Sequence, residues 1–231
     1  MSVNYVFDDN GIYIRNLANN AEQLGIGQYR FPHNYELVGK TFVVAAGDKE
    51  YTITFNCRLG AELNGVKCGY ECEKLNKDLY FVQLGLNSAV LDLENGQVAL
   101  IIDDELICGV INGLGEKAPS LIGDDMVETK VRWVFGCGRY INQEFISADT
   151  VRTAWAPQDE KTADNAYKAV KFRDTFYLVV AESGDLKNVC APFFTKHVIL
   201  LEDYERCMAV GCVKGTGFDP IVVTGYAKFI D

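Results

Sequence analysis

Hydrophobic positions in this chain form short runs of β-branched and aromatic residues, each closed by Gly, Asn or Asp. Runs of this length between turn residues are typical of β-strands. The expected strands are Phe42–Ala45, Tyr51–Phe55, Leu79–Leu84, Ala89–Leu93, Val98–Ile102, Glu105–Ile111, Val131–Phe135, Tyr140–Phe145, Thr150–Trp155, Phe176–Val180, Val198–Leu201, Cys207–Val213 and Ile221–Phe229. Close turn signals such as Asn95-Gly96 favour hairpins over βαβ units. The pattern therefore predicts an all-β, antiparallel chain.

Helix is expected only in two short segments, Asn19–Leu24 and Thr162–Ala169. The clearest break in the pattern is the turn-rich run from Gly113 to Asp125. Loops with this composition often separate folding units. We therefore predict two halves, residues 1–115 and residues 124–231.

The two predicted halves resemble each other. Tyr70–Val82 aligns without gaps with Tyr167–Val179, Leu37–Tyr51 matches Met126–Tyr140, and Val90–Glu94 matches Val198–Glu202. The offset grows from 89 to 97 to 108, which indicates insertions near 146–166 and 181–197. Long loops at a barrel rim often shape a pocket. These matches predict an internal repeat, and the alternative is that strands of similar composition align by chance.

Composition and charge exclude several function classes. The formal net charge is −10, so a nucleic-acid partner is not expected, because such a surface must neutralise phosphates. The longest apolar run, Val98–Ile102, is far shorter than a membrane helix needs, and the N-terminal residues lack the features of a secretory leader. We therefore expect no membrane partner and a cytoplasmic protein. The eight cysteines form no CxxC pair and are expected to be reduced, mostly buried thiols.

The sequence indicates no cofactor. The only histidines are His33 and His197, which makes a dedicated transition-metal site unexpected. Gly211–Gly217 lacks the spacing of a phosphate-binding loop, and no glycine fingerprint opens a helix. We predict neither a metal nor a nucleotide.

Four segments together resemble the MoaF family: Leu37–Phe42, Tyr80–Val82, Leu91–Glu94 and Tyr226–Phe229. The resemblance rests on their order and covers the chain from about residue 35 to the end. It implies two tandem calycin or lipocalin-like β-barrel halves, one N-terminal and one C-terminal. It also implies a link to molybdenum cofactor biosynthesis, although no residue pattern in the chain indicates a pterin site.

A second, local resemblance concerns the strand around Tyr177–Ser183, which is similar to the strand that carries the catalytic Glu of phenolic acid decarboxylases. These enzymes are single calycin barrels that use Tyr, Arg and Glu inside the barrel. The resemblance implies catalytic roles for Tyr140, Arg152 and Glu182. An inward Arg152 would need a carboxylate or an anionic ligand, because an unpaired buried charge is costly. The alternative is that Arg152 points outward and is solvated.

Aromatic residues in the second half offer a surface on which a planar ligand could stack. The candidate ligand-binding residues are Trp133, Trp155, Tyr167 and Tyr177, with His197 at the rim. The alternative is that the aromatic residues are ordinary core and the histidine is structural.

Three function classes follow from these patterns. We expect a MoaF-like protein that binds a small, planar organic molecule in a barrel pocket. The alternative is a cofactor-free lyase or isomerase acting on an aromatic or enolisable acid in the C-terminal barrel. An enzyme predicts Arg152 and Glu182 side by side in one hollow, and a binder predicts an apolar hollow without them. A scaffold with filled barrels is the third class, and the sequence leaves a homo-oligomer open.

Overall fold

A computed structural model describes residues 28–136, 138–155, 162–182, 194–216 and 219–229, and it gives the backbone of β1 (Tyr5–Phe7) and β2 (Tyr13–Arg15). The described chain is all-β, as the sequence predicts, and forms two closed, antiparallel, eight-stranded barrels. Its described helical content is one 3-10 turn, η1 (Asp124–Met126). No described helix has the length and hydrophobicity to cross a membrane.

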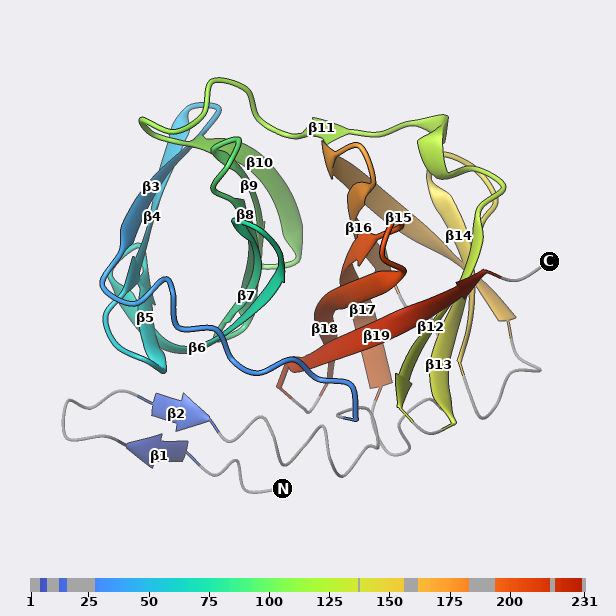
Figure 1. Cartoon of the computed structure of the whole chain (residues 1–231), viewed down its shortest axis with the longest axis horizontal. Helices are drawn as coiled ribbons and strands as arrows, with labels where there is room; N and C mark the ends of the chain where they lie inside the picture. Colours follow the sequence, from blue (N-terminus) through green and yellow to red (C-terminus); the bar gives the residue numbers. More distant parts are fainter. Residues whose placement is uncertain are drawn as a thin grey trace. The chain divides into compact units, whose positions relative to one another are not determined.

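The first barrel runs from β3 to β10, and β10 closes it by pairing with β3 (Figure 1). Its strands are β3 (Thr41–Ala46), β4 (Lys49–Phe55), β5 (Gly60–Leu63), β6 (Val66–Asn76), β7 (Leu79–Leu84), β8 (Asn87–Asp92), β9 (Gln97–Ile102) and β10 (Glu105–Ile111). Alternate residues point inward, as the pleat of a strand requires. The inward side chains form a core that includes Val44, Ile53, Phe55 and Leu91.

The second barrel runs from β12 to β19 and closes through the pairings β12–β19 and β15–β16. Its strands are β12 (Lys130–Gly136), β13 (Arg139–Phe145), β14 (Thr150–Trp155), β15 (Thr162–Arg173), β16 (Phe176–Glu182), β17 (Phe194–Asp203), β18 (Met208–Thr216) and β19 (Ile221–Phe229). A short strand, β11 (Ser120–Leu121), adds to the edge of β15. The inward side chains again form one core, which includes Trp133, Phe145, Val151 and Leu200.

One helix prediction is wrong. Thr162–Ala169 belongs to β15, where alternate residues such as Asn165 and Tyr167 are buried. Its alanines favour helix by propensity, but pairing with β14 and β16 overrides that preference. The other helix prediction, Asn19–Leu24, lies outside the described residues.

The chain divides into two compact units. Residues 31–119 lie in one unit and residues 120–231 in the other, and the described segment Gln28–Arg30 belongs with the second. All six described cysteines are free thiols, as expected, but only Cys72 and Cys212 are buried.

The two barrels share equivalent backbone hydrogen bonds and equivalent ring contacts. Phe55 and Phe145 each donate their backbone N–H back to the preceding turn, at 2.9 and 3.0 Å. The rings of Phe55 and Tyr70 meet edge-on at 5.0 Å, and those of Phe145 and Tyr167 at 5.1 Å, both at 68°. These repeated contacts define which positions in one barrel correspond to which in the other.

The structural correspondence corrects two of the sequence matches. The β12–β13 hairpin holds one residue more than the β3–β4 hairpin, so Tyr51 points inward whereas Tyr140 points outward. Downstream, the Leu79–Asp92 pairing corresponds to Phe176–Asp203, which moves the true offset of β8 and β17 to 111. The sequence match of Val90–Glu94 with Val198–Glu202 is therefore displaced by three residues.

Candidate functional site

The three predicted catalytic residues do not point into the barrel. Arg152 lies between two inward neighbours on β14 and bonds outward to Asp164, with Nε to Oδ1 at 2.7 Å, and to Glu144 at 3.7 Å. Tyr140 lies under the guanidinium of Arg132 at 4.0 Å. Glu182 is exposed. The structure therefore does not place Arg152 and Glu182 in one hollow.

Four of the five predicted ligand residues do lie inside the second barrel. Trp133, Trp155 and Tyr167 are buried in its core, and the half-buried Tyr177 packs against it. Their rings contact further aromatics, among them Tyr204, whose ring lies 5.9 Å from that of Trp133 and 5.7 Å from that of Tyr177. His197 is separate, because it precedes the inward Val198 and pairs with Glu182 across β16 and β17.

The interior also holds a carboxyl group, that of Glu202, which the sequence analysis did not select. Glu202 is fully buried on β17, opposite Tyr177 in the pairing with β16. The hydroxyl of Tyr204 donates a hydrogen bond to Glu202 Oε2 at 2.8 Å. Burial raises the pKa of Glu202 to about 8, although the Tyr204 hydroxyl and the indole N–H of Trp133 near the carboxyl act in the opposite direction. The carboxyl is therefore mostly protonated at neutral pH.

Polar groups of Gln143 and Trp155 share this interior. Trp133 Nε1 donates to Gln143 Oε1 at 2.9 Å, which fixes the orientation of the amide. Gln143 Nε2, Trp155 Nε1 and Glu202 Oε1 have no hydrogen-bond partner among the described residues. Unpaired buried polar atoms each cost about 1–3 kcal/mol, and native proteins hold few of them.

Corresponding positions of the first barrel are apolar. Trp133, Gln143, Glu202 and Tyr204 correspond to Val44, Ile53, Leu91 and Leu93. Leu93 and Tyr204 correspond because they make equivalent backbone hydrogen bonds. Leu93 N–H donates to the Asp78 carbonyl at 2.7 Å, and Tyr204 N–H donates to the Thr175 carbonyl at 3.0 Å. A closed barrel with the same strand order thus folds with apolar residues at these four positions. The sequence signal that could have identified Glu202 is its place directly after the apolar run Val198–Leu201, on the same strand face as Val198 and Leu200.

An open depression of about 510 Å³ adjoins β15 at the second barrel. Its lining includes polar side chains on the outer side, such as Asp164 and Lys168, and Tyr167 from the barrel core. Its volume falls within the range of small-molecule sites. Among the described residues no group of acidic, His or Cys side chains is arranged to hold a metal ion.

Fold and site together define a calycin-like, double β-barrel protein with one polar barrel interior. No family model matches the chain, and no curated protein matches it. A solved structure described as a "putative beta-lactamase" from Burkholderia vietnamiensis aligns at 11% identity and a TM-score of 0.38, covering 46% of this chain and 96% of that one. A likeness at that TM-score carries no argument. The resemblance to the MoaF family and its link to molybdenum cofactor remain predictions.

Proposed function

We propose that the chain binds a small, planar organic molecule inside its second barrel. One observation carries the proposal: three buried polar atoms, on Gln143, Trp155 and Glu202, have no partner among the described residues. Two of these residues replace apolar ones of the first barrel, Ile53 and Leu91. Folding alone does not require them, so a bound molecule that pairs with them would offset their cost.

The chemistry of these groups indicates the chemistry of the ligand. A protonated Glu202, the Gln143 amide and the Trp155 indole N–H are all hydrogen-bond donors. They would suit a ligand with carbonyl oxygens or ring nitrogens as acceptors. The rings of Trp133, Tyr177 and Tyr204 provide surfaces for a planar ring system. An eight-stranded barrel has room for one small ligand among its inward side chains.

Native mass spectrometry of the protein purified from its own host is the direct test, with a co-purifying small molecule expected. A titration with the neutral, planar ketone dye 6-propionyl-2-(dimethylamino)naphthalene, whose carbonyl oxygen accepts hydrogen bonds, provides a defined probe. The only two tryptophans, Trp133 and Trp155, lie inside the second barrel, so energy transfer from them is strongest for dye bound there.

The matched variant restores the first-barrel residues, Gln143→Ile with Glu202→Leu. We expect at least tenfold weaker dye binding in this variant and unchanged binding in Glu182→Gln, because Glu182 is exposed. Equal affinity in the wild type and the double variant, together with no co-purifying molecule, would refute the proposal.

A second candidate function is proton-transfer catalysis on an aromatic or enolisable acid in the same barrel. It is favoured by Glu202, because a carboxyl with a pKa of about 8 can both accept and donate a proton near neutral pH. Phenylpyruvate in deuterated buffer tests it, with NMR measuring deuterium incorporation at the enolisable carbon. Loss of exchange in Glu202→Gln would support catalysis, and a wild-type rate equal to that of buffer would exclude it for this substrate.

A further inference from the structure

We infer that the depression beside β15 is the passage by which a ligand reaches the interior of the second barrel, and that the corresponding passage of the first barrel is plugged by His33, Tyr35 and Arg58. The inference rests on the proposed function, since it assigns the route to that site. It also explains why only one of two barrels built on one plan would be accessible.

The passage lies where the edge of β15 changes partner. β14 pairs with β15 as far as Ala166, and Tyr167 N–H then donates to Asp149 at 3.0 Å. Farther along the same edge, Ile122 N–H donates to Ala169 at 3.0 Å and β11 pairs beyond it. Lys168 lies between the two pairings and lines the depression.

Residues whose side chains belong to the barrel interior form part of the depression's wall. Its lining includes Asn165, Tyr167 and Ala169, which alternate on the inward face of β15. Tyr167 and Ala169 belong to the buried core, and Asn165 donates inward to Thr153 at 2.7 Å. The depression therefore runs along the strand edge that carries these inward residues.

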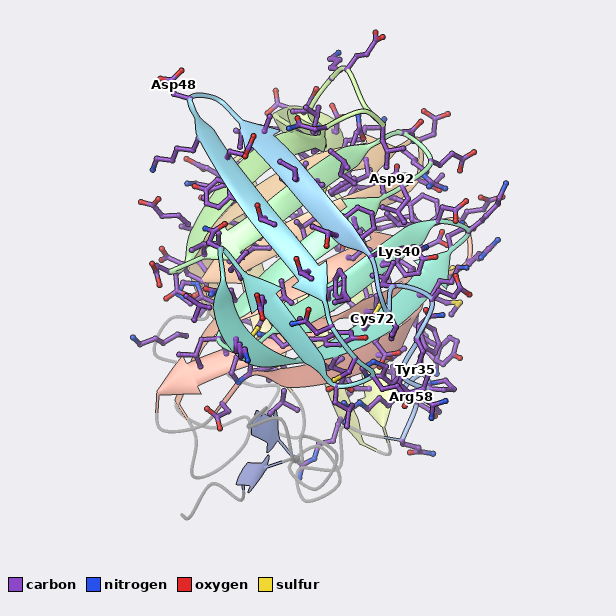
Figure 2. All side chains as sticks on the ribbon, turned by 90° about the vertical axis from the view of Figure 1, so that its left-hand side faces the viewer. Tyr35, Lys40, Asp48, Arg58, Cys72 and Asp92 are labelled. Carbon is purple, nitrogen blue, oxygen red and sulfur yellow. The ribbon has the colours of Figure 1, made fainter. Side chains whose placement is uncertain are left out.

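The first barrel has the same edge but covers it with stacked side chains. Tyr70 N–H donates to Leu59 at 3.1 Å and Asn34 N–H to Cys72 at 2.7 Å, which repeats the pairing pattern around Tyr167. His33 stacks on Tyr35 at 4.6 Å and meets the Tyr70 ring edge-on at 5.1 Å. The guanidinium of Arg58 covers the Tyr35 ring at 5.2 Å, and Figure 2 shows these two side chains together, away from the Asp48 turn.

Each residue of this plug is replaced in the second barrel. Leu121, Asp124 and Ala148 correspond to His33, Tyr35 and Arg58. The Tyr35 position is fixed by matching turns, in which Val38 N–H donates to Tyr35 at 3.2 Å and Val127 N–H to Asp124 at 3.0 Å. Leu121 is 64% exposed, so it does not cover the opening as His33 does. The plug is therefore absent where the depression occurs.

Tyr167 separates the depression from the polar interior. It is buried, and its hydroxyl donates to the Ser147 backbone at 3.0 Å. Burial raises the pKa of Tyr167, and the charges of Asp149, Asp124 and Glu202 raise it further. Turning the ring aside breaks one neutral hydrogen bond and the edge-on contact with Phe145. Tyr167 is therefore placed to act as an inner gate of the passage.

Transfer of the plug tests the passage. The variant combines Leu121→His, Asp124→Tyr and Ala148→Arg, and stopped-flow tryptophan energy transfer measures dye binding. We expect association and dissociation of 6-propionyl-2-(dimethylamino)naphthalene both to slow at least tenfold, with an equilibrium affinity within threefold of wild type. A blocked route changes both rates equally, because it leaves the bound state unchanged. Ala148→Arg alone serves if the triple variant does not fold.

Two further variants and a quenching measurement serve as controls for the passage. Tyr167→Ala is expected to accelerate both rates, and Tyr35→Ala with Arg58→Ala is expected to change neither, because both tryptophans lie in the second barrel. If the dye does not bind the wild type, acrylamide quenching of tryptophan decides access, and the plugged variant should be quenched less. Unchanged rates with dye, or unchanged quenching without it, would overturn the passage. Slower association and dissociation of dye in the plugged variant would support the passage even if the Gln143→Ile, Glu202→Leu variant binds dye normally. The passage and the binding proposal can therefore be refuted independently.

Discussion

Glu202 is completely buried and accepts one hydrogen bond, from Tyr204. Its Oε1 has no hydrogen-bond partner among the described residues. Desolvation penalises its charged form more than Tyr204 and Trp133 stabilise it, so burial controls the protonation state. A neutral acid can donate a hydrogen bond, and an ionised one can only accept. At the residue scale, therefore, the protonation state of this one side chain would select among ligands under the proposed binding function.

The raised pKa of Glu202 predicts a pH-dependent stability. The folded chain keeps this proton up to about pH 8, whereas an unfolded Glu loses it near its ordinary value of 4.5, so stability falls as pH rises between these values. Replacing Glu202→Gln should remove this loss, which is on the order of 4 kcal/mol across the window. Urea unfolding at pH 5 and pH 9, followed by tryptophan fluorescence, measures it. Glu182→Gln is the exposed control, and parallel pH profiles in wild type and Glu202→Gln would contradict the assignment.

Tyr204→Phe should raise the pKa of Glu202 further. The hydroxyl donates to Oε2 and lowers the pKa by stabilising the charged carboxylate, so its removal should move the titration up by roughly one unit. Fluorescence of the neighbouring Trp133 as a function of pH reports the midpoint. Tyr177→Phe is the matched control, because its hydroxyl faces the Asp174 backbone, and a larger shift there than in Tyr204→Phe would count against the model of a direct bond.

At the scale of elements, two equivalent turns set the register that brings Glu202 inward. Asp92 Oδ1 accepts the N–H groups of Glu94 and Asn95 at 3.1 and 3.3 Å. Asp203 Oδ1 accepts those of Glu205 and Arg206, both at 3.0 Å. Each aspartate ends its strand in the same way, and a shift by one residue would turn Glu202 to the other face.

Strands β17 and β18 approach each other closely at Gly211, so this glycine also constrains the position of β17. A Cβ at Gly211 would overlap the carbonyl oxygen of Ile199, whereas a Cβ at Gly123 would meet open space. We therefore expect Gly211→Ala to lower the unfolding free energy by about 3 kcal/mol or more, because the strands must move apart. Gly123→Ala should change it by less than about 1 kcal/mol. Thermal unfolding followed by circular dichroism tests both, and equal effects would show that the strand contact is not limiting.

At the scale of the whole molecule, the first barrel serves as a reference for the second. Two closed barrels share strand order, hairpin bonds and the edge-on Phe–Tyr pair, and they differ in what fills the interior. The first uses apolar residues such as Ile53 and Leu91, and the second places Gln143 and Glu202 there. Polar groups without partners reduce stability, and Gln143 and Glu202 carry them at positions where the first barrel is apolar, which is why we propose the second barrel as the binding site.

Replacing a buried polar pair of the second interior by apolar residues should therefore stabilise the protein while weakening binding. When both partners of a buried hydrogen bond are replaced by apolar groups of similar shape, the change can be nearly neutral or stabilising. We expect Glu202→Leu with Tyr204→Phe, which removes both partners of their hydrogen bond, to raise the melting temperature at pH 8 and to weaken dye binding. Calorimetry measures the first effect, and a lower melting temperature at pH 8 would mean that these side chains stabilise the fold.

Sequence patterns located strands rich in β-branched residues but missed strands with mixed faces. β6 carries Lys67, Glu71 and Glu73, and β5 is only four residues long, so neither shows a clean alternation. The sequence also selected four aromatics that lie inside the barrel. It assigned Arg152 a candidate inward role because parity shows which residues share a face but not which face is inside. Asp164, which binds Arg152 outside, was recognised only in the structure.

The sequence by itself determined the class of the fold, because short β-branched runs between turn residues leave antiparallel hairpins as the way to satisfy the backbone. It also determined the repeat and the aromatic character of the second half. Only the tertiary structure decided which side chains face inward and that Glu202 replaces Leu91, since ring closure and register depend on pairing between distant strands. The difference between a plugged and an open barrel edge depended on the same pairing.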